Sequence, residues 1–194
     1  GELFVLMGPR TIAVVEDRDP EEPCGYQRTA TPGTNKAQAV GRAAAQIPTS
    51  SEVYRKLVGE ALGIPDVQLT HLLKIDLEGD GVDEVVYAAS SHPDGVPMGG
   101  ETEHYSSVGI RKVRTTDGQT QVDTVEITGH KGTADFNGGF PDITQIFIEG
   151  FADLDGDGKL EIVIRIRGYE SHFIGVYRLE GKEAEMIGST ECAI

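Results

Sequence analysis

The chain has 194 residues, a length that suits a single domain able to bury a substantial hydrophobic core. It carries 17 Lys and Arg against 32 Asp and Glu, which gives a formal net charge of −15. This acidity argues against nucleic acid or an anionic membrane as a partner. No stretch approaches the roughly 20 apolar residues that span a bilayer, and no signal peptide is recognised.

Residues 1–66 predict a hairpin, a loop and one or two helices. Two β-prone runs, Leu3–Met7 and Thr11–Val15, lie on either side of Gly8-Pro9-Arg10, which is typical of a β-hairpin. The acids, prolines and glycines of residues 16–35 indicate a surface loop.

Two segments of this first part have helical character. The alanine-rich residues 36–47 are expected to form a short helix, although their apolar stripe is weak. A better helix is predicted over residues 51–62, because apolar side chains recur there at helical spacing and a hydroxyl side chain at 49–51 can cap it. Gly63 and Pro65 should end this helix, which needs a sheet to cover.

Residues 67–128 and 143–190 read as two copies of one unit. The matching segments, first copy against second, are 68–69 with 145–146, 76–84 with 153–161, 85–87 with 162–164 and 108–112 with 174–178. Each copy predicts strand, acidic loop, strand, turn and strand, with fourth strands at 121–128 and 183–187. The insertion in the first copy, residues 92–103, should protrude as a loop. Two antiparallel meanders are the expected result.

The two acidic loops place oxygen-bearing side chains at alternate positions around two glycines. A hard cation such as Ca²⁺ takes roughly six to eight oxygen ligands, and a curled loop can turn alternate carboxylates inward where glycine adopts a positive φ. The predicted metal ligands are the side chains of Asp76, Glu78, Asp80 and Glu84 with the carbonyl of Val82, and the side chains of Asp153, Asp155, Asp157 and Glu161 with the carbonyl of Lys159. One or two calcium ions are therefore expected. The alternative is an acidic turn without an ion, in which Asp side chains cap backbone amides.

The sequence around the second loop distinguishes between calcium motifs. An EF-hand carries a bidentate glutamate at position 12, where this chain has Ile164. Asp-Leu-Asp-Gly-Asp-Gly-Lys-Leu-Glu at 153–161, followed by a β-rich run, instead resembles the FG-GAP or VCBS-type repeat, whose loop joins two strands of a propeller blade in integrin-like extracellular proteins. The first copy departs from that pattern at Glu78, where Asp is commoner. The resemblance covers residues 67–187.

The expected fold is mainly β. Residues 1–194 should form one domain of two blade-like antiparallel meanders, with an N-terminal hairpin and one or two helices. Two or three blades cannot close a propeller of roughly four to eight. The resemblance implies a secreted, periplasmic or cell-surface bacterial protein that binds calcium structurally and recognises a protein or carbohydrate. The alternative is a secreted hydrolase that acts on a polysaccharide or cell-wall substrate, with calcium supporting its scaffold.

No catalytic residue is identified, since the chain has neither a Gly-x-Ser-x-Gly elbow nor a phosphate-binding glycine loop. An acid–base or sugar-binding rim could form, but only if the two turns meet in the fold, from His92, Glu101, Glu103 and His104 together with Glu170 and His172.

Two further expectations concern the cysteines and the basic residues. Cys24 and Cys192 are expected to form a disulfide bond, with two separate buried thiols as the alternative. The strand residues with basic side chains are expected on the solvated face of the sheets, where a shared basic strip could bind an acidic partner. They are Arg111, Lys112, Arg165, Arg167 and Arg178.

Overall fold

The computed structural model describes residues 3–6, 12–15, 42–94, 101–116, 119–135, 144–154, 156–168 and 171–193. For some strand residues, Cys192 among them, the backbone alone is described. These residues form one helix, a two-stranded hairpin, a five-stranded sheet and a four-stranded sheet. The mainly β fold expected from the sequence is confirmed, and the described strands close neither a barrel nor a propeller.

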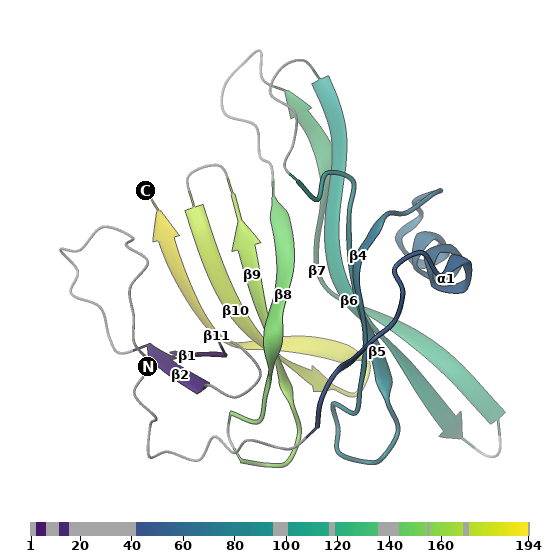
Figure 1. Ribbon diagram of the computed structural model, residues 1–194, viewed down its shortest axis with the longest axis vertical. Coiled ribbons are helices and arrows are strands. Elements are labelled where there is room, and N and C mark those ends of the chain that lie inside the picture. Colours follow the sequence, from purple (N-terminus) through teal and green to yellow (C-terminus); the bar gives the residue numbers. More distant parts are fainter. Residues whose placement is uncertain are drawn as a thin grey trace.

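Each copy of the repeat is an antiparallel meander of four consecutive strands (Figure 1). The first copy contributes β4 (Leu69–Ile75), β5 (Glu84–Ser90), β6 (Glu101–Thr116) and β7 (Gln119–Asp135), and the short β3 (Ala45–Gln46) pairs with the free edge of β4. The second copy contributes β8 (Gln145–Ala152), β9 (Glu161–Arg167), β10 (Ser171–Glu180) and β11 (Glu183–Ala193).

Matching residues of the two copies occupy matching places in the strand register. Val86 of β5 lies opposite Ile110 of β6, and the matching Val163 of β9 lies opposite Val176 of β10. The last strand of each copy is longer than predicted, because regular pairing continues well beyond the segment that its β-prone residues mark.

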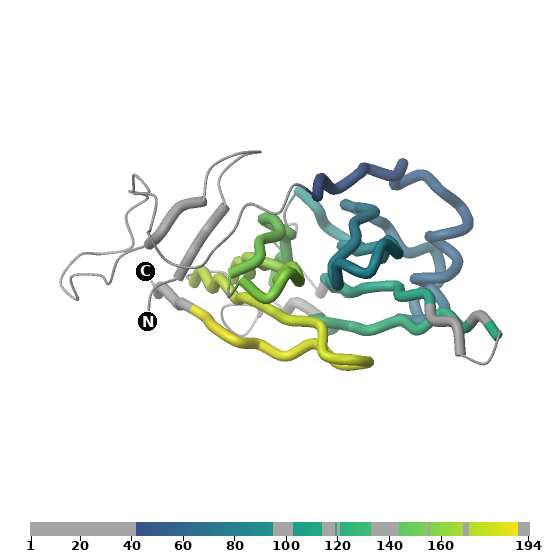
Figure 2. Tube along the Cα trace, turned by 90° about the horizontal axis from the view of Figure 1, so that it is seen from below, coloured from purple at the N-terminus to yellow at the C-terminus, as the bar shows by residue number. Residues whose placement is uncertain are grey.

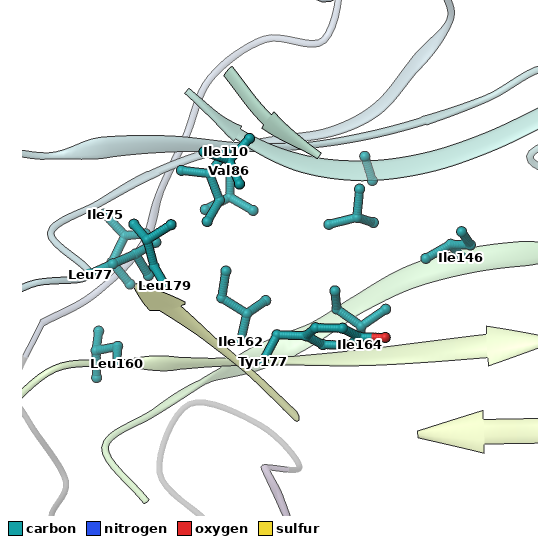
Figure 3. Close-up of a cluster of buried hydrophobic side chains, with 13 residues drawn as sticks. Ile75, Leu77, Val86, Ile110, Ile146, Leu160, Ile162, Ile164, Tyr177 and Leu179 are labelled. Carbon is teal, nitrogen blue, oxygen red and sulfur yellow. The ribbon is translucent and has the colours of Figure 1, made fainter. Parts of the chain in front are cut away.

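The two sheets pack face to face around the main hydrophobic core. Figure 3 shows Val86 and Ile110 of the five-stranded sheet on one side of this core and Ile162 and Ile164 of the four-stranded sheet on the other. Strand β5 is buried along its whole length because successive side chains point to opposite faces. Val86 and Ala88 enter this core, while Val85, Tyr87 and Ala89 belong to the cluster on the helix side.

The helix α1 (Glu52–Leu62) covers the outer face of the five-stranded sheet (Figure 1). Its buried Val58 contacts a second cluster that includes Leu72 and Tyr87. Ser51 is the N-cap residue, but its hydroxyl does not make the predicted cap hydrogen bond. Gly63 ends the helix at φ 65°, a left-handed conformation that glycine adopts without steric cost. The predicted helix and its boundaries are therefore confirmed.

Two expectations for local structure are wrong, and one is confirmed. Residues 42–47 are not helical, because Ala45 and Gln46 pair with β4 and Ile47 precedes a proline, which disfavours the helical conformation. Residues 101–103 are not loop but the start of β6, which pairs there with the end of β7. The expected N-terminal hairpin is present as β1 (Leu3–Leu6) and β2 (Ile12–Val15), and β1 contacts β8 and β11.

Candidate metal centre

The two acidic loops lie side by side at one end of the sheets. Residues 76–83 connect β4 to β5, and residues 153–160 connect β8 to β9. Figure 1 shows both turns at the lower edge of the molecule, and Figure 2 shows them adjacent from below. The amide of Leu160 donates a hydrogen bond of 2.7 Å to the carbonyl of Leu77, so the loops touch through their backbones.

The first loop is curled around the carboxylate of Asp76. One oxygen of Asp76 accepts hydrogen bonds from the amides of Gly79 (2.7 Å) and Asp80 (3.2 Å), and the other accepts from Gly81 (3.1 Å). Asp80 in turn accepts from the amide of Val82 at 2.8 Å. The sharp curl depends on Gly79 and Gly81, whose φ angles are 73° and 85°.

The second loop repeats this arrangement residue for residue. The carboxylate of Asp153 accepts from the amides of Gly156 (2.6 Å) and Gly158 (3.0 Å), which have φ angles of 80° and 88°. Asp157 accepts from the amide of Lys159 at 2.8 Å. Two sequences that differ at several positions thus reach one backbone conformation, because the bonds that close it join the carboxylates of shared aspartates to backbone amides, which Val82 and Lys159 supply equally well.

A buried glutamate closes each loop at position 9. Glu84 is 1 % exposed and Glu161 is 0 % exposed. Glu84 accepts a hydrogen bond from the amide of Leu77, and Glu161 accepts one from the amide of Leu154, both at 2.8 Å. Burial, together with the nearby Glu78 and Asp80 carboxylates, raises the pKa of Glu84 from 4.5 to about 6.

Besides Lys74, which pairs with Asp83 at 2.9 Å, three basic side chains approach the loops, and sequence patterns did not single them out for this role. Lys112 of β6 pairs with Glu78, and Nε of Arg178 lies 3.2 Å from Oε1 of Glu161. Lys112 and Arg178 occupy matching positions of the two repeats, and Lys112 is only 9 % exposed. The expectation that these two residues decorate a solvated face is therefore wrong: each reaches toward the acidic loop of its own repeat.

The third basic residue, Arg42, links the two loops. Its guanidinium donates to the carbonyl of Asp76 at 2.8 Å and to the carbonyl of Gly158. It also lies 3.6 Å from the Asp76 carboxylate. These two carbonyls belong to loop positions 1 and 6, whereas the predicted carbonyl ligand is at position 7. Arg42 therefore takes no predicted carbonyl ligand, but it does pair with the carboxylate of Asp76, which is a predicted side-chain ligand.

The donor set fits calcium in its chemistry, and the side chains are partly engaged elsewhere. Every predicted ligand is an oxygen, and a carboxylate that accepts one or two amide bonds still has lone pairs for a cation. Among the described residues, however, no three acidic, His or Cys side chains gather into a metal-binding group, and Glu78 faces Lys112 instead. Asp155, the position-3 ligand of the second loop, lies outside the described residues.

The other candidate residues lie on different strands, and several of them fall outside the described residues. His104 is buried in β6 and its ring stacks on His130 of β7 at 4.9 Å, while His172 lies in β10. Glu170 lies outside the described residues, as do Cys24 and the side chains of Glu101 and Cys192, so the acid–base rim and the disulfide remain predictions.

The comparisons with protein-family models, with curated proteins and with solved structures gave no match. None of the described helical residues forms a segment long and apolar enough to cross a membrane.

Proposed function

We propose that this chain is an extracytoplasmic calcium-binding β-domain of the FG-GAP or VCBS type. The observation that carries the proposal is the twin acidic loop: the same hydrogen bonds, the same pair of positive-φ glycines and the same buried closing glutamate recur in both repeats. An acidic turn needs only its Asp caps to close. In the first loop, the buried Glu84 lies near the carboxylates of Glu78 and Asp80, and a divalent cation would remove this repulsion.

In the first loop, the side chains of Asp76, Glu78, Asp80 and Glu84 and the carbonyl of Val82 would hold the ion. In the second, the side chains of Asp153, Asp155, Asp157 and Glu161 and the carbonyl of Lys159 would do so. A bound calcium ion supplies charge neutralisation and fixes the loop. The residues of the chain supply the rest: amides hold the first aspartate in place, and glycines give the curl.

The role of the ions would be structural, and the domain would serve as a recognition module for a protein or carbohydrate. Calcium sites of extracellular modules have affinities of roughly 0.1 to 1 mM, so the loops would fill outside the cytosol. A disulfide between Cys24 and Cys192 would suit the same compartment, because such bonds persist in oxidising environments.

Thermal unfolding with and without calcium tests this proposal. We expect the melting temperature of the wild-type chain to rise with calcium concentration by mass action, and the double variant Asp153→Ala with Asp157→Ala to lose the part that the second loop contributes. A matched control is Glu183→Ala with Glu185→Ala, which removes two exposed acids from β11 and the same net charge. Identical wild-type curves in about 10 mM calcium and in chelator would contradict the proposal.

A further inference from the structure

A small cavity lies at the end of the sheets opposite the acidic loops. Its volume is about 290 Å³, near the lower limit of roughly 300 Å³ for small-molecule sites. It is lined by the first residues of β4 and β8, the last residue of β5, and Gln68 and Pro93 next to these strands. The acidic loops follow the other ends of β4 and β8, so the full length of each strand separates them from the cavity.

Equivalent positions of the two repeats form the floor of this cavity. Gln68, Leu69 and Thr70 of the first copy match Gln145, Ile146 and Phe147 of the second, and all six residues line it. Two glutamine side chains from corresponding positions therefore border one cavity. The sheets do not meet through equivalent faces, since Val86 lies in the shared core and its counterpart Val163 does not, yet the first strands of both copies border this cavity.

The walls are held in place by bonds between strands. The amide of Ile146 donates to the hydroxyl of Ser106 at 2.9 Å, which fixes the start of β8 against β6. The amide of Gln68 donates to the hydroxyl of Tyr105 at 2.7 Å. The cavity is therefore part of the folded framework and needs little rearrangement to accept a ligand.

The lining is neutral in a highly charged chain. Its nine residues include no Asp, Glu, Lys or Arg, although the chain carries 17 basic and 32 acidic residues. Five of the nine bring polar side chains: Gln68, Thr70, His71, Ser90 and Gln145. Only Leu69, Ser90 and Ile146 of the lining are buried, but the lining offers no counter-charge to a charged ligand, so this cavity favours an uncharged ligand.

The hydrogen-bonding groups supply both donors and acceptors. Nε2 of Gln145 donates to the carbonyls of His92 (3.2 Å) and Pro93 (3.4 Å), which orients the carboxamide. Among the contacts of the described residues, Oε1 of Gln145 is left to accept a hydrogen bond from a ligand. Nδ1 of His71 lies 3.4 Å from the hydroxyl of Thr70, and the carboxamide of Gln68 can both donate and accept. Phe147 also lines the cavity, and the guanidinium of Arg165 lies 4.6 Å from the centre of its ring, so only the opposite face of the ring can contact a ligand.

We propose that this cavity binds one neutral sugar residue. Sugar hydroxyls donate and accept hydrogen bonds at once, as carboxamides and imidazole do, while the C–H face of a sugar ring packs on an aromatic side chain. The volume accommodates a small ligand and not a long polymer segment, so the residue recognised would be a terminal or single unit.

The test uses the full chain labelled with ¹⁵N and the free sugars glucose, galactose and N-acetylglucosamine, followed by amide chemical shifts. At least one of these sugars should shift the amides of Gln68, His71 and Gln145, and Gln68→Ala or His71→Ala should weaken that binding at least tenfold. A matched control is Gln121→Ala, an exposed glutamine of β7 outside the cavity, which should bind as the wild type does.

Glucuronic acid provides the decisive comparison, since it differs from glucose by a carboxylate. Binding of the acid as tight as that of the neutral sugars would overturn the proposal, and so would shifts that map away from the cavity or no shift with any sugar. Because the cavity and the loops lie at opposite ends of the strands, sugar binding by the folded chain should persist in chelator. This outcome is independent of whether calcium binds.

Discussion

The effect of Glu84→Gln on the free energy of unfolding should change sign when calcium is added. Glu84 is 1 % exposed, accepts a hydrogen bond from the amide of Leu77, and lies near the carboxylates of Glu78 and Asp80. Glutamine has nearly the same shape, and its side-chain oxygen can still accept the Leu77 bond. The substitution therefore removes one buried negative charge and little else.

The magnitude follows from the pKa of Glu84, which burial raises from 4.5 to about 6. A group with a raised pKa in the folded state binds its proton more tightly there than in the unfolded chain, so folding loses stability as the pH rises through this interval. At about 1.4 kcal/mol per pKa unit, the ionised form costs the folded state about 2 kcal/mol above pH 6. Without calcium, Glu84→Gln should be more stable than wild type by up to about 2 kcal/mol at about pH 7.5, and equally stable at about pH 4.5.

Calcium should cancel or reverse this difference. An ion with an affinity of roughly 0.1 to 1 mM stabilises the folded state by about 1.4 to 2.7 kcal/mol at about 10 mM, and the variant loses that gain at the first loop. Urea unfolding of both proteins at the two pH values, in chelator and in calcium, measures all four differences.

The matched control is Glu161→Gln in the second loop. Arg178 pairs with Glu161, so neutralising this glutamate should destabilise the chain without calcium, by about 1 to 3 kcal/mol. A Glu84→Gln variant that is less stable than wild type in chelator at about pH 7.5 would refute the electrostatic reasoning. A variant that keeps its advantage in calcium would refute the assignment of Glu84 as a ligand.

Three other substitutions test the packing. Arg42→Ala removes the guanidinium that bridges the loops and should lower the free energy of unfolding by about 1 to 2 kcal/mol. Hydrogen exchange should increase at the amides of both loops, and an increase in one loop alone would contradict the link. Tyr87→Phe should leave the melting temperature unchanged or raise it, because the buried Tyr87 hydroxyl has no hydrogen-bond partner among the described residues and Ser107 donates to Glu126 instead. A clear fall in the melting temperature would show that the hydroxyl is bonded. Gly109→Ala should lower the free energy of unfolding in urea by about 1 to 3 kcal/mol, since the new Cβ would lie 2.4 Å from the Tyr87 hydroxyl and 2.7 Å from the carbonyl of Val125. Combining it with Tyr87→Phe should not restore stability, because the clash with the Val125 carbonyl persists.

The amino-acid sequence by itself determined the elements whose contacts are local. The curl of each acidic loop is closed by bonds between residues three to five positions apart, such as Asp76 with Gly79 and Gly81. The helix ends where Gly63 can turn left-handed. The repeat is visible in the sequence because both copies carry the same acids, glycines and β-branched residues at matching positions. The meander follows from short turns between strands.

Only the tertiary structure decided what surrounds the loops and where a ligand can enter. Arg42 contacts Asp76 and Gly158, which are 34 and 116 positions away, and no spacing rule connects residues so far apart. The sequence predicts Lys112 as an exposed strand residue, whereas the fold of the sheet places it beside Glu78. The apolar faces of the two sheets are removed from water by packing against each other. This packing brings the first strands of the two repeats together, and the neutral cavity lies where they meet.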